Sequence, residues 1–153
     1  MYKQDYILET TKLNLLTSLI DEVTLDSKNP RLGISGIDNI SVYSSSRWKS
    51  WSRDQKAIFK SCFPEDIINK SLIGWFLHIP KNSGFLDLML KWADQKTCGT
   101  VLAVALNDNQ TVYLDGNAVT VNKGQVIKFK LSVPHEIVKS NVEQKWACAM
   151  ILE

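Results

Sequence analysis

The sequence predicts an α+β protein whose core is mostly an antiparallel barrel or sandwich of jelly-roll type. Three observations lead to this prediction. From Gly74 onward, about seven short apolar or alternating runs follow one another at close spacing, joined by tight turns. The dipeptide Asp115-Gly116 separates TVYL from NAVTV, which is the strongest hairpin signal in the chain. Helical patterns precede residue 70, so we expect two or three N-terminal helices packed on the barrel.

The N-terminal part contains three segments with a helical or mixed pattern. Residues 12–23, KLNLLTSLIDEV, space their large aliphatic side chains as one helical face, although the flanking threonines leave a strand possible. Residues 32–45, LGISGIDNISVYSS, alternate weakly and indicate one or two short strands. Ser52 and Gln55 match a capping box that opens the helix DQKAIFKSCF. Residues 64–66, Pro-Glu-Asp, are typical of another helix start, because proline and acidic residues favour the first turn.

The C-terminal part consists mainly of strand patterns. GWFLHIP is a short apolar run that stops at Pro80, and FLDLMLKWA fits either a helical turn or a strand. TVLAVAL, residues 100–106, is a continuous apolar run, which is typical of a strand buried on both faces. QVIKFKL, residues 125–131, alternates apolar residues with lysines that face water. HEIVKS and WACAMIL complete the predicted set of strands.

Length and composition indicate one ordinary globular domain. At 153 residues the chain is long enough for a proper core, and we expect a single domain over residues 1–153. In this prediction, residues 1–70 form a mixed N-terminal part that packs on a core formed by residues 71–153. The composition is 44% hydrophobic and 22% charged. A formal net charge of +2 does not indicate a nucleic-acid or membrane partner, so we expect a small molecule or a protein.

The cysteines and the N-terminus indicate the compartment. Cys62, Cys98 and Cys148 are far apart and odd in number, and they form no CxxC pair, which excludes a cysteine-based zinc site. Cys148 lies in an apolar run, which is typical of a buried, reduced thiol. The N-terminal MYKQDYILETTK has no apolar signal core, and no apolar stretch is long enough to span a bilayer. We therefore expect a soluble, cytoplasmic protein.

The two histidines are the main candidates for site chemistry. His78 lies near the end of the first strong strand pattern, and His135 begins a late one. Strands that are distant in sequence can face each other inside a rolled sheet, so the two imidazoles can converge. Imidazole is a common metal ligand, and two histidines with one carboxylate bind iron(II) in non-haem oxygenases. The alternative is that His78 is a buried core residue whose ring is hydrogen-bonded, and that His135 is a turn residue at the barrel rim.

A family resemblance is carried by GQVIKFKLSVPHEI, followed by Lys145 and WACAMIL. This segment resembles the C-terminal half of the double-stranded β-helix in the iron(II)/2-oxoglutarate-dependent oxygenases, and TVLAVALND is similar to a core strand of that family. The resemblance covers roughly residues 74–153 and implies a cupin-like double-stranded β-helix. It implies that His78 and His135 bind Fe(II), and that Lys145 binds the distal carboxylate of 2-oxoglutarate.

The sequence departs from this family at the first metal-binding motif. The family has His-x-Asp or His-x-Glu on an early strand, whereas this chain has His78-Ile79-Pro80, and proline has no ligating side chain. The third ligand then comes from elsewhere, with Asp87 or Glu136 as the nearest carboxylates in sequence, or it is absent. Two hypotheses follow. The chain is an oxygenase of unknown substrate, or it is a non-catalytic jelly-roll module that binds a protein or a small ligand.

One basic and aromatic segment suggests a different partner. RWKSWSR, from Arg47 to Arg53, interleaves Trp48 and Trp51 with three basic residues, and such surfaces stack the bases of single-stranded nucleic acids. The rest of the chain adds no basic surplus. We therefore predict that the two tryptophans pack on the barrel while the cations stay in water.

Overall fold

The computed structural model describes residues 2–23, 25–26, 44–64, 72–86 and 99–152. Within these residues, the chain forms two α-helices, one short 3₁₀ helix at Trp48–Ser50 and eleven strands. The helices are α1 (Thr10–Glu22) and α2 (Arg53–Ser61). The strands are β1 (Tyr2–Ile7), β2 (Leu25–Asp26), β3 (Ser44–Ser46), β4 (Leu72–Ile79), β5 (Ser83–Leu86), β6 (Gly99–Ala105), β7 (Gln110–Leu114), β8 (Asn117–Val121), β9 (Gln125–Lys130), β10 (His135–Ser140) and β11 (Gln144–Leu152).

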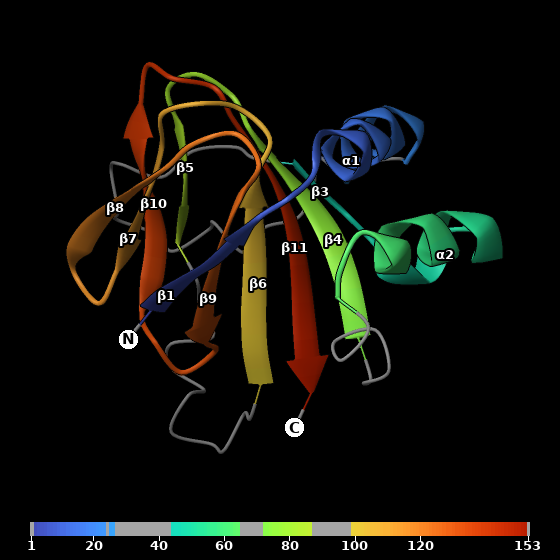
Figure 1. The fold of residues 1–153 in the computed structure, drawn as a ribbon. Helices are drawn as coiled ribbons and strands as arrows, with labels where there is room; N and C mark the ends of the chain where they lie inside the picture. The colour runs from blue at the N-terminus through green and yellow to red at the C-terminus, as the bar shows by residue number, and fades with distance from the viewer. Residues whose placement is uncertain (1, 24, 27–43, 65–71, 87–98, 153) are drawn as a thin grey trace.

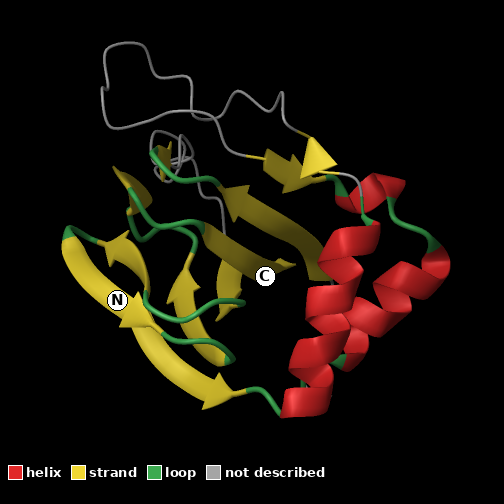
Figure 2. Ribbon diagram, turned by 90° about the horizontal axis from the view of Figure 1, so that it is seen from above, coloured by secondary structure: helices red, strands yellow, loops and turns green. Residues whose placement is uncertain are grey.

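The strands form two antiparallel sheets that face each other, and the helices cover the larger one. The larger sheet has the order β1-β9-β6-β11-β4-β3-β2, and the smaller has the order β5-β10-β7-β8. Figure 1 shows α1 and α2 beside β4, on the side of the large sheet away from the small one. Seen from above in Figure 2, the strands curve into a barrel with the helices outside it. The predicted α+β jelly-roll fold is therefore confirmed.

Two local sequence signals are confirmed in detail. TVYL and NAVTV pair antiparallel, with Leu114 opposite Asn117. The turn residues Asp115 and Gly116 both have positive φ angles of 51° and 79°, as a type I′ hairpin requires. The side-chain oxygen of Ser52 accepts a hydrogen bond from the backbone N–H of Gln55, and the backbone N–H of Ser52 donates to Oε1 of Gln55, so the capping box opens α2.

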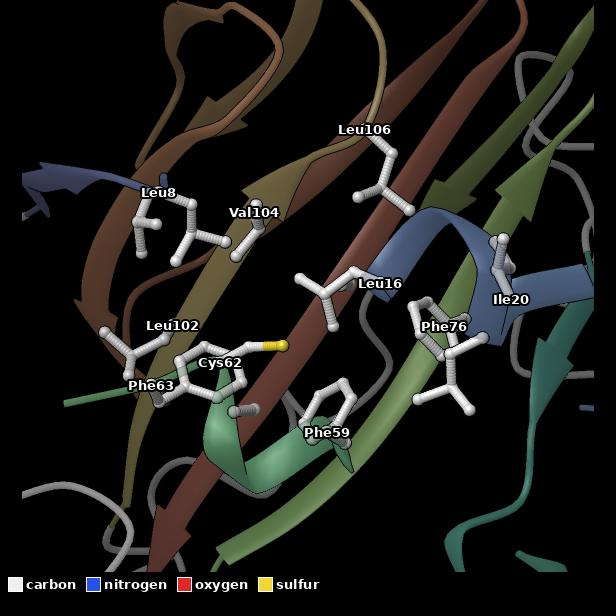
Figure 3. Packing of buried hydrophobic residues seen from close by; sticks show 14 of the residues in the cluster. Leu8, Leu16, Ile20, Phe59, Cys62, Phe63, Phe76, Leu102, Val104 and Leu106 are labelled. Atoms are coloured by element: carbon white, nitrogen blue, oxygen red, sulfur yellow. The ribbon is translucent and has the colours of Figure 1, made fainter. Parts of the chain in front are cut away.

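The helices pack on the large sheet through an outer cluster of buried side chains (Figure 3). Its members are Leu8, Leu13, Leu16, Leu19, Ile20, Val23, Trp51, Phe59, Cys62, Phe63, Leu72, Phe76, Leu102, Val104, Leu106, Val126, Ala147, Ala149 and Ile151. The packing is close at its centre, because a Cβ added to Gly74 would lie 2.5 Å from Cε1 of Phe59. Only glycine therefore lets the fully buried ring of Phe59 rest on β4.

A second, inner cluster fills the barrel between the two sheets. Its members are Leu77, Ile79, Val101, Ala103, Ala105, Val112, Leu114, Val119, Val121, Ile127, Phe129, Val133, Ile137, Trp146 and Cys148. Neighbouring residues of one strand alternate between the two clusters, as in β6, where Leu102 is outer and Ala103 inner. The central strands of the large sheet are thus buried on both faces, as the continuous apolar run TVLAVAL predicts.

The structure settles several open points in the N-terminal part. Residues 12–23 are mostly helical rather than a strand, and β1, which the sequence did not reveal, pairs with β9. Trp51 is buried and stacks on Phe76 with ring centroids 5.3 Å apart, which confirms its predicted packing role. Trp48 is partly buried against it, beneath the ammonium of Lys56.

Some predicted elements fall on residues that the structure does not describe. These are most of the strands expected in residues 32–45, the helix start at residues 64–66 beyond its proline, and the later part of FLDLMLKWA. Among the described residues, no helix is long and apolar enough to cross a membrane.

Candidate functional site

The barrel contains a hollow of about 40 Å³ that opens to solvent. This volume is far below the range of about 300–1,000 Å³ that is common for small-molecule sites, so the hollow has room for only a very small ligand. The residues that line it come from both sheets and are mostly apolar: Leu77, Ala103, Val112, Ile127, Phe129, His135, Glu136, Ile137, Trp146 and Cys148. Its wall is therefore the inner cluster together with the start of β10.

His135 is the histidine that the structure places at this hollow. Its ring lies 5.1 Å from that of Phe129, centroid to centroid, and is partly buried. Nδ1 is 2.7 Å from the carbonyl oxygen of Val133, and because a carbonyl only accepts, Nδ1 donates. In the neutral ring, Nε2 then carries the lone pair. A backbone carbonyl that fixes the tautomer in this way is typical of metal-bound histidines, although it also suits an ordinary hydrogen-bonding histidine.

His78 lies on the opposite face of the large sheet. Along β4, Phe76 belongs to the outer cluster, whereas Leu77 and Ile79 belong to the inner one. Successive side chains of a strand point to opposite faces, so His78 shares the outer face with Phe76. Its Nε2 is 3.0 Å from Oε2 of Glu143, in the turn before β11. The structure therefore does not bring the imidazoles of His78 and His135 together inside the barrel.

Lys145 also lies on the outer face. On β11, Trp146 and Cys148 belong to the inner cluster and Ala147 to the outer one, so the parity of the strand turns Lys145 outward. It stands directly opposite His78 in the β4–β11 ladder. The expected convergence of Lys145 with His135 in one cavity is therefore not what the structure shows.

The two carboxylates considered as third ligands do not complete a site with His135. Glu136 borders the hollow, but the alternation along β10 turns its side chain away from the face shared by His135 and Ile137. Asp87 lies outside the described residues. Among the residues that the structure describes, no group of three or more His, Cys, Asp or Glu side chains is placed to hold a metal ion.

An outer polar group, formed by His78, Glu143 and Lys145, takes the place of the expected internal site. The hydrogen bond with His78 is the main reason why the pKa of the Glu143 carboxyl lies below its usual value, and the positive charges of Lys145 and Lys81 lower this pKa further. The side chain of Glu143 is about half exposed, at 45%. The group therefore links β4 to the β10–β11 turn at the surface, where solvent weakens such pairs.

Two buried glutamines that the sequence did not single out occupy one end of the barrel. The side chain of Gln110 donates to the backbone oxygen of Lys145 (2.9 Å) and accepts from its nitrogen (2.6 Å). Gln144 accepts from Nε1 of Trp146 (2.9 Å) and donates to the oxygen of Thr111 (3.3 Å). Parity along β7 and β11 places both glutamines on the inner face. The sequence feature that could have indicated this arrangement is the glutamine at the first position of both β7 and β11.

The described residues do not fit an iron and 2-oxoglutarate site. The chain has only two histidines, and His78 faces away from the hollow that His135 lines. Of the described side chains that line the hollow, none is a lysine or an arginine that could pair with the carboxylates of 2-oxoglutarate. Burial raises the pKa of the Cys148 thiol well above its usual value, so this lining group stays neutral.

Comparison with solved structures shows which known proteins share this fold. No family model matches the sequence, and no curated protein matches it. A prolyl-4-hydroxylase from Pseudomonas putida has a TM-score of 0.68 at 13% identity, covering 99% of this chain and 92% of its own. HygX from Streptomyces hygroscopicus, solved with nickel, 2-oxoglutarate and hygromycin B, has a TM-score of 0.65 at 12% identity, covering 99% and 82%.

A third structure extends the comparison. A prolyl hydroxylase from Trichoplax adhaerens, in complex with a hypoxia-inducible-factor peptide fragment, has a TM-score of 0.66 at 11% identity, covering 99% of this chain and 82% of its own. The chain thus has the double-stranded β-helix fold of the 2-oxoglutarate oxygenases. Identities this low establish the fold, and the chemistry has to be argued from the residues of this chain.

Proposed function

We propose that this protein is a non-catalytic binding module that holds a small, mainly apolar ligand inside its double-stranded β-helix. The observation that carries the proposal is the hollow between the sheets, whose lining combines apolar side chains with the imidazole of His135. Sites of this kind bind by burying apolar surface and use a few polar groups to orient the ligand. A polar group of the ligand would lie at His135 and its apolar body against Trp146 and Ile127.

The directions of the side chains support this function over oxidation. An iron site of the two-histidine type needs His78 inside the barrel. Turning His78 inward would require a one-residue shift of β4, which would also move every neighbouring side chain of that strand to the opposite face. Leu77 and Ile79 would then leave the inner cluster. Such a rearrangement is unfavourable because both faces of β4 are buried.

An oxygenase that uses Fe(II) and 2-oxoglutarate is the second candidate, and one observation favours it. The hydrogen bond between Nδ1 of His135 and the carbonyl of Val133 directs the Nε2 lone pair away from the backbone, as in a metal-bound histidine. Iron bound there would supply the oxidising chemistry. His135 alone among the described residues would hold it, because His78 and Lys145 face outward.

The buried thiols support the inferred setting. Cys62 and Cys148 are free and buried, and burial raises the pKa of both. Neutral thiols of this kind are inert core residues, as expected in a reducing compartment. We therefore retain the inference that the protein works in the cytoplasm.

Methyl NMR of protein labelled at Ile, Leu and Val tests the proposal with ethanol as the probe, because a hollow of about 40 Å³ takes only a very small ligand. We expect saturable shifts at Leu77, Val112 and Ile127, which line the hollow, and none at Leu102 and Val104 on the outer face of β6. Shifts that fall equally on both sets, or on neither, would contradict an internal binding site. The variant Ala103→Leu, which fills the hollow, should abolish the shifts while the outer methyl signals stay in place.

A further inference from the structure

Basic residues are concentrated in one short segment of the chain. Residues 47–63 contain five basic side chains and a single acidic one, Asp54, although the whole chain has a net charge of only +2. The rest of the chain therefore holds more acidic than basic residues. A charge distribution this uneven attracts a partner of the opposite sign to one place on the surface.

Three of these cations form a basic stripe along α2, which consists of Arg53, Lys56 and Lys60. Their spacing of three and four residues places them on one face of the helix. The fully buried Phe59 fixes a different side of α2 in the outer cluster, and the capping box fixes its first turn. Figure 2 shows the helices outside the barrel. The fold therefore holds the stripe in a defined position on a surface helix.

The carboxylates that the structure describes do not neutralise the stripe. Arg53 is exposed, and neither Arg53 nor Lys60 forms an ion pair with another described residue. Asp54 follows Arg53 directly, and adjacent residues of a helix do not face each other. Lys56 lies over the ring of Trp48, with Nζ 5.4 Å from the ring centroid. This contact orients the ammonium group and leaves its charge in place.

The surroundings of the stripe favour a short acidic segment over a long polyanion. Trp51 is buried and Trp48 packs between Lys56 and Trp51, so neither ring is available to stack on a nucleic-acid base. At 1.5 Å per residue, the stripe spans only about 10 Å along the helix axis. The neighbouring helix α1, which contacts α2, ends in the exposed residues Asp21 and Glu22. These carboxylates would repel a chain of phosphates that continues across the helical surface.

We propose that the basic stripe is a docking surface for a short acidic segment of a partner protein. Carboxylates on a partner helix recur with the same spacing of three and four residues, so they can face the three cations in turn. The guanidinium of Arg53 can bind one carboxylate through two parallel hydrogen bonds, whereas Lys56 and Lys60 act as point charges. Exposed pairs are individually weak, so the association is reversible and sensitive to salt. This surface lies outside the barrel, and its function does not depend on a ligand in the hollow.

Octaglutamate is a suitable probe, and octaglutamine is an uncharged control of the same length. Amide NMR of the full chain records where each peptide binds. We expect octaglutamate to give saturable shifts at Arg53, Lys56 and Lys60, and octaglutamine to give none. Added salt should weaken the binding, because it screens charges at the surface. The absence of saturable shifts on α2, or equal shifts with octaglutamine, would overturn the proposal.

Two matched double variants locate the surface, because each removes two positive charges. Arg53→Gln combined with Lys60→Gln removes both ends of the stripe, and we expect octaglutamate to bind at least about threefold more weakly. Lys123→Gln combined with Lys128→Gln removes two exposed cations from the β8–β9 turn and β9. This control should weaken binding far less, since it changes only the long-range attraction. Equal weakening in the two variants would show that net charge alone matters and would contradict the assignment to α2.

A short RNA duplex tests the other class of polyanion. We expect it to bind more weakly than octaglutamate at the same salt concentration, because its phosphates extend past the stripe towards the acidic residues Asp21 and Glu22. A duplex that binds more tightly than octaglutamate, and loses this affinity in the Arg53→Gln and Lys60→Gln variant, would assign the surface to nucleic acid. That result would overturn the acidic protein partner.

Discussion

The two faces of the large sheet are packed in different ways. On the outer face, the rings of Phe59, Trp51 and Phe76 contact one another with centroids 5.3–5.7 Å apart, and Gly74 lets Phe59 approach the strand. On the inner face, small side chains such as Ala103 border a hollow that opens to solvent. The outer face therefore serves mainly to stabilise the fold, whereas the inner face leaves room for a ligand.

This difference also explains the positions of the polar side chains. The inner face contains His135 and two hydrogen-bonded glutamines, Gln110 and Gln144. The outer polar group of His78, Glu143 and Lys145 lies where the end of β4 meets the start of β11. The three residues that the predicted oxygenase site requires, His78, His135 and Lys145, are thus divided between the two faces of the large sheet.

The largest expected effect comes from removing a ring from each face. Phe59→Ala should lower the free energy of unfolding by about 3–5 kcal/mol, because the fully buried ring leaves a cavity. Phe129→Ala should have an effect smaller by about 1 kcal/mol, since that ring already borders the hollow and has fewer neighbours to lose. Urea unfolding followed by circular dichroism measures both. Equal losses, or a larger loss for Phe129→Ala, would contradict the difference in packing.

An intermediate effect is expected from adding methyl groups to a pair of matched alanines. Ala149→Val adds bulk to the close-packed outer face and should destabilise the protein by about 1–3 kcal/mol. Ala103→Val adds the same groups beside the hollow and should be neutral or stabilising by up to about 1 kcal/mol. The two alanines lie on adjacent strands, β11 and β6, so the comparison isolates the face. Thermal unfolding should show the two midpoints shifting by different amounts, and equal shifts would argue against the hollow.

The smallest effect concerns the outer polar group. The folded pKa of Glu143 is lowered, so its contribution to stability is present above the unfolded pKa of about 4.3 and is lost as the pH falls through the folded value. Glu143→Gln should therefore be less stable than the parent by under about 1 kcal/mol near neutral pH, and equally stable in acid. Chemical unfolding over this pH range measures the difference, which added salt should reduce. A difference that grows in acid would contradict the assignment.

The fold could be predicted from the sequence where the signals are local. Asp115-Gly116 forces a tight turn whatever surrounds it, and Ser52 with Gln55 closes its own capping box. Alternation in QVIKFKL also reveals which side of β9 faces water, because the lysines are exposed. In contrast, β1 has no such signal, since its place depends on pairing with β9 more than a hundred residues away in the sequence.

The candidate site could be predicted only in part, for a physical reason. A strand buried on both faces has no alternation of apolar and polar residues, so GWFLHI does not reveal that Leu77 faces inward and His78 outward. The run after Lys145 has the same defect, so it does not reveal that Lys145 faces outward. Sequence reasoning predicted the barrel, but it could not assign the faces on which His78 and His135 lie.

The central claim is that this double-stranded β-helix presents its two histidines on different faces and so lacks the two-histidine iron site. Absorption spectroscopy of the protein titrated anaerobically with Fe(II) and millimolar 2-oxoglutarate tests it directly. Our account expects no visible metal-to-ligand band, and it expects His135→Ala and His78→Ala to give spectra that match the parent. A band that appears on adding 2-oxoglutarate and disappears in both histidine variants would contradict the account.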